Sequence, residues 1–258
     1  MFNKIFNKKY EFHNDFKSNI KHILITGAAG VIGTSLREHL SQHYNFRCLD
    51  INAIPNTNNM IIADITNFKA VLEAMQGVDA VIHLAANPKL NQAWDDVYHS
   101  SIGGTYNIFE AARQAGVTKV IYASTTHVSI WPDIKQQVLI TPEMPVNPDT
   151  LYGVGKACGE MLGRFYTEKY NLSVICLRIG WFKLKPEINN PDQLQRFIRT
   201  WCSPKDLAQL VRRSLDTDNL GFQIFYAVSN NRQRFWDISN AQKLVGYQPE
   251  DDAEKFLP

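Results

Sequence analysis

The sequence predicts an α/β protein built on a doubly wound parallel sheet, with a small lobe at its C-terminus. Three observations support this fold class. A short apolar segment ends at a loop with spaced glycines, similar apolar segments then alternate with helical patterns, and a Tyr and a Lys lie four residues apart on a later helix. We expect an N-terminal extension at residues 1–20, the sheet domain at residues 21–180 and the lobe at residues 181–258.

The first strand is predicted at His22–Thr26, where consecutive apolar and β-branched residues suit a strand buried on both faces. The loop after it carries Gly27, Gly30 and Gly33. Glycines at this spacing allow a tight turn, a close approach of the backbone to a pyrophosphate, and packing of the next helix, here Val31–Gln42. The pattern is typical of a Rossmann-type dinucleotide site, although glycine triplets also occur in loops that bind no ligand.

The second strand, Asn45–Leu49, ends on Asp50. In dinucleotide sites an acidic residue about 20 positions beyond the glycine loop accepts a hydrogen bond from the adenosine ribose. Asp50 stands at this distance, so we expect it to bind the ribose. A carboxylate there repels the 2′-phosphate of NADP, and Ile51 supplies no compensating charge, so the sequence predicts NAD as the cofactor.

The third strand, Met60–Ala63, ends at Asp64, and Asn67 is predicted to cap a helix that runs to Gln76. A fourth buried strand is predicted at Asp79–Leu84. These segments continue the alternation of strand and helix, and they place further polar and small residues at the carboxyl ends of strands.

Ala85 and Ala86 follow the fourth strand. Open α/β sheets bind their ligands at the carboxyl ends of strands, and small side chains there leave room for a flat cofactor. A plain transition from strand to loop would have the same composition. The next helix is predicted at Ser101–Gly116, followed by a fifth strand at Lys119–Ala123.

The fifth strand ends in a polar run that consists of Ser124, Thr125, Thr126 and His127. Hydroxyl groups at the end of a central strand suit the hydrogen bonding of a substrate hydroxyl. Such clusters also end strands for purely local reasons, because they bond to nearby backbone groups.

A helix opening at Asp149 or Thr150 carries Tyr152 and Lys156, which lie on one face because they are four residues apart. A free tyrosine, with a pKa of about 10, is a poor base at neutral pH. An ammonium ion at ~4 Å is worth about 4 kcal/mol at an effective dielectric constant near 20, and could lower that pKa by up to ~3. The pair therefore predicts a general base; its structural alternative is a packing or solvated pair.

The C-terminal segment is predicted to hold a helix at 193–200, a second helix that begins at Ser203–Asp206, a strand at 222–228 and a helix at 238–245. With about a hundred residues after Lys156, the lobe suits a compact sugar better than a nucleotide sugar.

Composition excludes several classes of protein. The 258 residues are 45% hydrophobic and 20% charged, which is the range of globular proteins, and the net charge of +2 argues against nucleic acid as a partner. The cysteines, Cys48, Cys158, Cys176 and Cys202, form no Cys-x-x-Cys pair, so no metal site is expected.

No apolar segment approaches the ~20 residues of a membrane helix, and residues 1–20 lack the continuous apolar centre of a secretory signal. We therefore expect a cytoplasmic protein that has no membrane partner. An amphipathic surface or transit segment at residues 1–20 is the alternative to a loosely packed extension.

At these motifs the chain resembles the extended short-chain dehydrogenases/reductases, the NAD-dependent epimerase/dehydratase family. The Thr-Gly-x-x-Gly-x-x-Gly motif of that family matches Thr26–Gly33, and its Tyr-x-x-x-Lys motif matches Tyr152–Lys156. Further segments resemble the short uronate dehydrogenases and related sugar dehydrogenases, namely Leu177–Gly180, Phe235–Asp237 and Gly246–Pro249.

The resemblance implies that Tyr152 is the catalytic base, that Lys156 holds the nicotinamide ribose and lowers the tyrosine pKa, and that Thr125 positions the substrate hydroxyl, with Ser124 as the fallback. Besides Tyr152 and Lys156, it implies contacts to NAD from Gly27, Gly30, Val31, Ile32, Gly33, Asp50, Asp64, Ile65, Leu84, Ala85 and Ala86.

On the substrate side, the resemblance implies that Thr126 and His127 contact the sugar and that Arg196 binds its carboxylate, for which the planar guanidinium is suited. An exposed helix residue is the alternative for Arg196, and a hydrogen-bonded strand-end histidine is the alternative for His127. Four departures from the family pattern concern this region: Ser101 replaces the Asn of a preceding helix, Ser129 replaces an aromatic residue of the pocket wall, Trp181 replaces a small polar residue, and the segment Lys183–Asp192 is longer.

The sequence thus predicts NAD-dependent oxidation of a small sugar, most simply of a uronic acid at C1 to its lactone, by a homo-oligomer. A sugar phosphate or a neutral aldose are alternative substrates. A nucleotide-sugar epimerase or dehydratase is the alternative enzyme, and an NAD-binding scaffold or sensor is the alternative that is not an enzyme.

Overall fold

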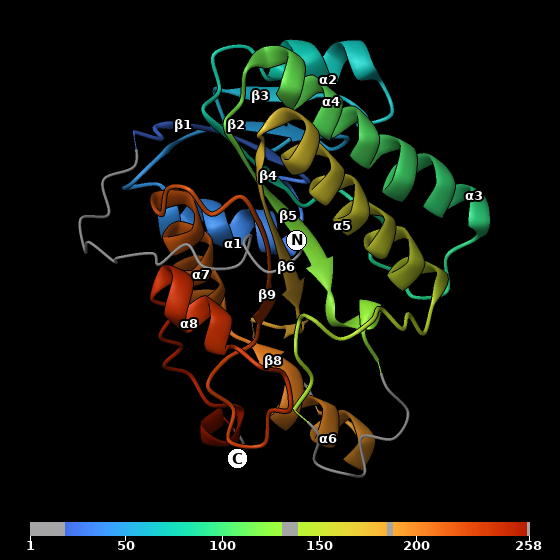
Figure 1. Cartoon of the computed structure of the whole chain (residues 1–258), viewed down its shortest axis with the longest axis vertical. Helices are drawn as coiled ribbons and strands as arrows, with labels where there is room; N and C mark the ends of the chain where they lie inside the picture. The colour runs from blue at the N-terminus through green and yellow to red at the C-terminus, as the bar shows by residue number, and fades with distance from the viewer. Residues whose placement is uncertain (1–18, 131–138, 185–187, 257–258) are drawn as a thin grey trace, which may run out of the picture.

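The computed structural model describes residues 19–130, 139–184 and 188–256. The predicted N-terminal extension therefore lies outside the described residues except for Asn19 and Ile20, and the predicted segment Lys183–Asp192 is described only in part. Within this part of the chain, seven parallel strands form one sheet with helices on both faces (Figure 1). The predicted doubly wound α/β fold is confirmed.

The central sheet has the strand order β3-β2-β1-β4-β5-β6-β9. Its strands are β1 (His22–Thr26), β2 (Asn45–Asp50), β3 (Met60–Ile62), β4 (Ala80–His83), β5 (Lys119–Thr125), β6 (Ser173–Ile179) and β9 (Phe222–Ala227). From β1 the chain winds first towards β3 and then, from β4, in the opposite direction. The reversal creates a crevice at the carboxyl ends of β1 and β4, where such sheets bind ligands.

Two helical layers cover the sheet. One face carries α1 (Val31–Leu40), α7 (Pro204–Asp216) and α8 (Ser239–Val245), and the other carries α2 (Phe68–Ala74), α4 (Thr105–Ala115) and α5 (Leu151–Tyr170) (Figure 1). In β1, Ile23 and Ile25 pack into one hydrophobic core and Leu24 into the other, because successive strand residues point to opposite faces. This two-sided burial explains the continuous apolar runs of the strands.

The predicted caps are confirmed, since Asn67 accepts a hydrogen bond from the Ala70 amide at 3.2 Å and Ser203 accepts one from the Asp206 amide at 3.1 Å. Most predicted boundaries differ from the observed ones by one or two residues, and one differs by more. The helix predicted from Ser101 begins earlier, as α3 (Trp94–Asp96), and continues through the π-helical segment η1 (Val97–Gly104) into α4. The glycines at 103 and 104, which resemble a helix boundary in the sequence, lie inside this wider helix.

A small lobe lies beyond the carboxyl end of the sheet, at the bottom of Figure 1. It contains the paired strands β7 (Trp181–Phe182) and β8 (Trp201–Cys202), helix α6 (Pro191–Thr200) and the short helix η4 (Ala253–Phe256). Its own core is formed by Phe197, Ile198, Trp201 and Ala253. The sheet contains residues from both sides of the boundary predicted at residue 180, because β9 pairs with β6.

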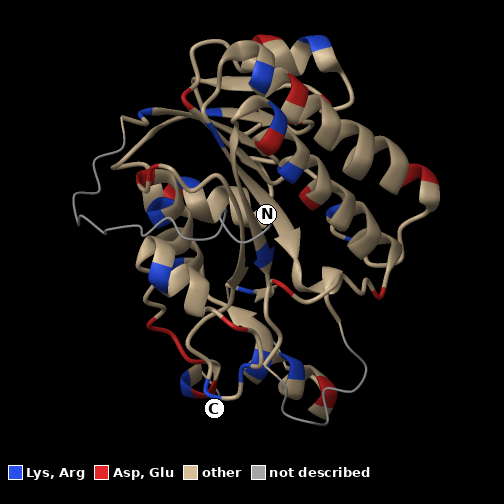
Figure 2. Cartoon of the chain, viewed as in Figure 1, with Lys and Arg blue, Asp and Glu red and all other residues tan. Residues whose placement is uncertain are grey.

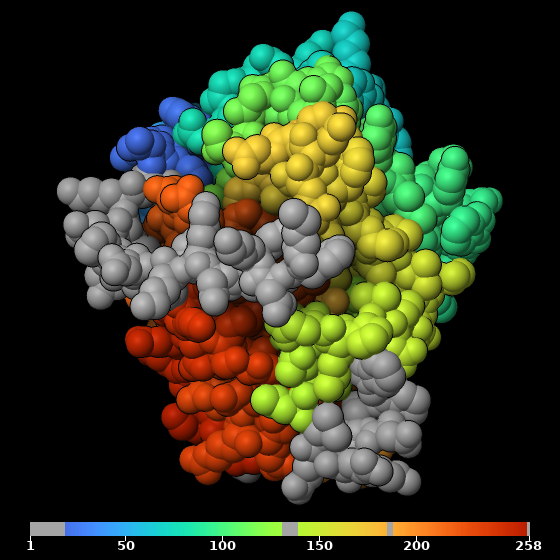
Figure 3. All heavy atoms as spheres, viewed as in Figure 1, coloured from blue at the N-terminus to red at the C-terminus, as the bar shows by residue number. Residues whose placement is uncertain are grey.

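The segment 139–150 connects the lobe side of the molecule to the start of α5. The Ile140 amide donates to the Phe235 carbonyl at 2.7 Å, and the Asp237 amide donates to the Ile140 carbonyl at 2.9 Å. Figure 3 shows this segment, in yellow-green, packed against the red C-terminal part of the chain. The Asn147 backbone amide also donates to the Val128 carbonyl at 2.8 Å, so the segment is held close to the end of β5.

Acidic and basic residues are spread over both helical layers in the cartoon of Figure 2. Among the described helices, none is both long and apolar enough to cross a membrane. In the same part of the chain, no group of His, Cys, Asp and Glu side chains is arranged to hold a metal ion.

Candidate active site

The glycine loop after β1 leaves the amide groups at the start of α1 open to an anion. Gly27 has a φ of +71°, and a Cβ there would lie 2.7 Å from the Ala85 amide nitrogen, so only glycine fits this turn. The N-cap of α1 is Gly30, which offers no side-chain acceptor. Several other helices do have one, from Asn67, Thr150, Asn190 and Ser203. The first amides of α1, from Val31, Ile32 and Gly33, therefore suit a pyrophosphate.

Asp50, at the end of β2, is only 8% exposed and lies beside this loop. One carboxylate oxygen accepts a hydrogen bond from the Ala29 amide at 2.9 Å, and the other accepts one from the Asn52 amide at 2.9 Å. Each carboxylate oxygen has a second lone pair that can accept from a ribose hydroxyl. Arg47 donates to the carbonyls of Ala74 and Gln76, so this cation is not directed at the ribose site.

The other residues predicted to contact the cofactor follow the carboxyl ends of β3 and β4. Asp64 accepts a hydrogen bond from the Thr66 amide at 2.8 Å, and Ile65 is buried. The Leu84 amide donates to the Thr26 carbonyl at 3.0 Å, and the Ala85 amide donates to the Thr26 hydroxyl at 3.4 Å. The structure thus gathers these residues and the glycine loop at one edge of the sheet. Together they fit a dinucleotide.

Tyr152 and Lys156 lie on the first turns of α5, where Thr150 caps the helix by accepting from the Gly153 amide at 3.1 Å. The Lys156 ammonium is 5.9 Å from the centre of the Tyr152 ring and 5.0 Å from that of Tyr122. Tyr152 and Lys156 therefore lie on the same face of α5, as predicted.

The pKa of Tyr152 differs from the sequence-based expectation. In the protein alone, burial raises the pKa of Tyr152 to about 12, and a hydrogen bond with the Thr125 hydroxyl opposes this rise. Burial also lowers the pKa of Lys156 to about 8. The expectation of a lowered tyrosine pKa failed because it counted the attraction of the ammonium and left out the desolvation of both groups.

The side chains of Thr125 and Ser124, at the end of β5, have different hydrogen-bond partners. The Ser124 hydroxyl donates to the Glu160 carboxylate at 2.6 Å, and Glu160 also forms a bidentate ion pair with Arg178, with N···O distances of 2.9 and 2.8 Å. Ser124 therefore belongs to a buried polar network. Thr125 is the hydroxyl next to Tyr152.

Ser101, at the position of the family Asn, is 1% exposed. Its hydroxyl has no hydrogen-bond partner among the described residues, and its Cβ would lie 2.8 Å from a Cβ placed on Gly155. The side chain therefore faces α5 between Tyr152 and Lys156.

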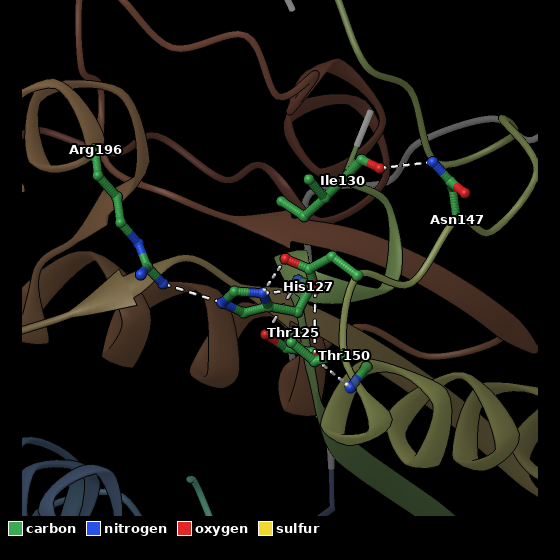
Figure 4. A network of polar contacts seen from close by, with 8 residues as sticks. Thr125, His127, Ile130, Asn147, Thr150 and Arg196 are labelled. Carbon is green, nitrogen blue, oxygen red and sulfur yellow. Dashed lines mark hydrogen bonds and ion pairs between the residues drawn. The ribbon is translucent and has the colours of Figure 1, made fainter. Parts of the chain in front are cut away.

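On the other side of the β5 terminus, the His127 ring lies between two charged side chains, those of Asp149 and Arg196, and Figure 4 shows its contact with Arg196. Its Nδ1 lies 2.9 and 3.0 Å from the two carboxylate oxygens of Asp149, and its Nε2 lies 3.0 Å from a guanidinium nitrogen of Arg196. The Arg196 guanidinium also lies over the Trp181 ring, 5.3 Å from its centre. Trp181, a departure from the family pattern, thus helps to hold the arginine.

A cavity of about 330 Å³ opens beside this row. It is lined by Thr126, His127, Ile130, Gln195, Arg196, Arg199, Thr200, Phe235 and Trp236. All three residues predicted to contact the substrate are among them. The aromatic wall and Asp149 were not predicted as substrate contacts. Arg199, one turn from Arg196, was expected to contact the substrate only if that substrate is a sugar phosphate.

The model of the NAD dependent epimerase/dehydratase family matches residues 23–183. The chain belongs to this family. The family description names NAD, which agrees with the predicted cofactor, and the segment matched contains the glycine loop, Asp50, Tyr152 and Lys156.

Relatives of this family member match nearly its whole length. An L-arabinose 1-dehydrogenase (NAD(P)(+)) of Haloferax volcanii is 34% identical over 90% of this chain and 97% of its own. A uronate dehydrogenase of Pseudomonas syringae pv. tomato is 35% identical over 91% of this chain and 83% of its own. The crystal structure of uronate dehydrogenase from Agrobacterium tumefaciens, 32% identical, superposes with a TM-score of 0.83 over 92% of this chain and 86% of that chain.

Proposed function

We propose that the protein is an NAD-dependent dehydrogenase that oxidises a uronic acid at C1 to the lactone. The observation that carries the proposal is the pairing of the Tyr152 and Thr125 hydroxyls at the end of β5 with an adjoining cavity that contains a held guanidinium, that of Arg196. Two relatives named uronate dehydrogenases share about a third of the sequence, which supports a carboxylate as the partner of Arg196.

In this mechanism the Tyr152 oxygen takes the proton of the C1 hydroxyl while Thr125 holds that hydroxyl by a hydrogen bond. Bound NAD supplies the hydride acceptor for the C1 hydrogen, so that C1 becomes the lactone carbonyl. The glycine loop and Asp50 would hold the cofactor. The Lys156 ammonium favours the phenolate form of Tyr152, against the burial that raises its pKa to about 12 in the protein alone.

Screening the purified protein with NAD against uronic acids, the matching neutral aldoses and sugar phosphates, with NADH absorbance as the signal, tests the proposal. Net NADH formation on uronic acids is expected. An epimerase or dehydratase would release no net NADH, and a scaffold or sensor would bind NAD without turnover.

A sugar phosphate is the second candidate substrate, because Arg196 and Arg199 both line the cavity and two guanidinium groups suit a dianion. For this substrate, Arg196→Ala and Arg199→Ala should each weaken activity strongly. For a uronic acid, only Arg196→Ala should do so.

With a uronic acid as substrate, Arg196→Ala is expected to lower kcat/KM by at least about tenfold, since a charge-assisted bidentate contact is lost. Activity on the matching neutral aldose should change by less than about twofold. Parallel steady-state assays of both sugars measure the difference. Equal losses on the two sugars would mean that Arg196 supports the lobe and not the substrate.

Asp50 is expected to make the enzyme prefer NAD to NADP. Asp50→Asn removes the charge that repels a 2′-phosphate and keeps one carbonyl oxygen to accept from the Ala29 amide, so it should lower the preference for NAD, measured as the NAD/NADP ratio of kcat/KM, by at least about tenfold. Glu73→Gln is the matched control, because Glu73 is an exposed acid on helix α2 and is not among the residues expected to contact NAD. Equal efficiency of the two cofactors with the unmutated protein would contradict the assignment.

The predicted homo-oligomer and cytoplasmic location also remain proposals. Exposed apolar side chains on α5, Met161, Phe165 and Tyr170, offer a surface on which a second copy could pack.

A further inference from the structure

The hydrogen bonds of His127 determine which of its ring nitrogens carries the proton. A guanidinium can only donate, so the Nε2 that lies 3.0 Å from Arg196 must accept. The proton of the neutral ring is then on Nδ1, which donates to the Asp149 carboxylate at 2.9 Å. The row therefore runs in one direction, with Arg196 donating to His127 and His127 donating to Asp149.

We propose that Asp149 is a positioning residue for the substrate: through His127 it holds the Arg196 guanidinium ready for the acid group of the sugar. The proposal rests on the proposed function, in which Arg196 binds that group. Because both ring nitrogens of His127 are engaged by protein side chains, His127 also positions Arg196 and does not donate a ring proton to the sugar.

Asp149 is itself held by contacts with the His127 backbone and with the start of α5, so its carboxylate can fix the His127 ring. Its amide donates to the His127 carbonyl at 3.4 Å, and its carboxylate accepts from the Thr150 hydroxyl at 3.3 Å. Thr150 caps α5 two residues before Tyr152. The turn of His127 and the start of α5 are packed so closely that a Cβ on Gly153 would lie 2.4 Å from the His127 carbonyl oxygen.

The position of Arg196 is therefore set from the same part of the fold as that of Tyr152. Arg196 is an exposed residue on α6, with a long side chain that loses much rotational freedom when it is fixed. The contacts with His127 and with the Trp181 ring fix it before the substrate arrives. Preorganisation of this kind improves binding without a new contact to the ligand.

Asp149→Ala and Asp149→Asn separate positioning from charge. The alanine variant removes the acceptor for His127, whereas the asparagine carbonyl keeps it and removes only the charge. Asp149→Ala should raise KM for the uronic acid about tenfold and leave kcat, and both constants for the neutral aldose, within about twofold. Asp149→Asn should restore most of the KM. Glu143→Ala is the matched control, because Glu143 is exposed in the same segment and makes no hydrogen bond or ion pair with the described residues.

Equal changes on the two sugars in Asp149→Ala would overturn the proposal in favour of a structural role. An asparagine variant as impaired as the alanine variant would overturn it in favour of a purely electrostatic one. Lack of uronate activity in the unmutated protein would count against the proposed function. The tautomer of His127 can be tested independently of that function.

The ring tautomer can be observed without any substrate. Nitrogen NMR of protein labelled with ¹⁵N-histidine, in which the His127 signal among seven histidines is assigned by its loss in His127→Gln, should show the Nδ1–H form. Asp149→Ala should shift this signal towards the Nε2–H form, and Asp149→Asn should not. An Nε2–H form in the unmutated protein would overturn the row and the positioning role with it.

Discussion

Replacement of Tyr152 by Phe is expected to lower kcat by at least about 100-fold, because general acid–base catalysis contributes about 10² to 10⁴ in rate. The substitution removes one oxygen and leaves the ring in place on α5. The affinity for NAD should change little, since the glycine loop and Asp50 are untouched. Steady-state kinetics and equilibrium binding of NAD, measured by quenching of tryptophan fluorescence, test the two halves separately.

Tyr122→Phe is the matched control for this prediction. Tyr122 is another buried tyrosine, 0% exposed, whose hydroxyl lies 3.4 Å from the Lys156 carbonyl and is also hydrogen-bonded to the Thr105 side chain. Its replacement should leave most of the activity. Residual activity of Tyr152→Phe above about a hundredth would return Tyr152 to a packing role.

The pH dependence of the unmutated enzyme gives a further test of the base. Burial raises the pKa of Tyr152 to about 12, so the phenolate fraction increases as the pH rises from neutral towards that value. We expect kcat/KM to increase with pH in the same direction, and the residual activity of Tyr152→Phe to lose this slope.

The cofactor half of the site could be predicted because each of its parts is local in sequence. A strand, its glycine loop and the next helix are consecutive, and the carboxyl ends of parallel strands meet at one edge of a sheet. Asp50 could therefore be placed beside the glycine loop from the alternation of elements, and its carboxylate is 2.9 Å from the Ala29 amide.

The substrate half could be predicted only through family resemblance, and only in part. His127 is 22 residues from Asp149 and 69 from Arg196 in sequence, and no local pattern relates them. Their approach depends on how the lobe and the segment 139–150 pack against the end of β5. The resemblance supplied Arg196 and His127, but it did not supply the acid that completes the row.

The pKa of Tyr152 could not be predicted, because the spacing of Tyr152 and Lys156 reveals proximity but not burial. Their distance favours the phenolate, but the desolvation of both groups opposes it and is larger in the protein alone. The same desolvation affects the stability of the folded protein. Lys119, a second buried lysine, provides the comparison.

Lys156 and Lys119 are both buried, at 2% and 4% exposure, and burial lowers the pKa of each to about 8. Their partners differ. The Lys119 ammonium donates to the carbonyls of Ser214, Leu215 and Thr217 at 3.1, 2.7 and 2.7 Å, at the end of α7. The Lys156 ammonium makes no hydrogen bond to the described residues and faces the rings of Tyr122 and Tyr152.

Lys156→Met is therefore expected to abolish activity and to stabilise the fold. Activity should fall by at least about 100-fold, because the variant loses the charge that favours the Tyr152 phenolate. The difference between about 8 and the ordinary value of 10.5 for the Lys156 pKa corresponds to a burial cost of up to about 3 kcal/mol. The free energy of unfolding at pH 7, measured with urea and without added NAD, should rise by up to that amount.

The sign of the pH dependence distinguishes this cause from a general packing gain. Because the folded-state pKa of Lys156 is lowered, the cost of its charge is complete below pH 8 and disappears as the pH rises to 10.5, where the unfolded chain also loses the proton. The advantage of Lys156→Met should shrink over the same interval. Lys119→Met should instead destabilise the protein at pH 7, because it leaves buried carbonyls without a donor. If Lys156→Met destabilised the protein as Lys119→Met is expected to do, the Lys156 ammonium of the unmutated protein would have to be paired. If Lys156→Met stabilised the protein, Lys156 would be a residue kept for its chemistry at the expense of the stability of the fold.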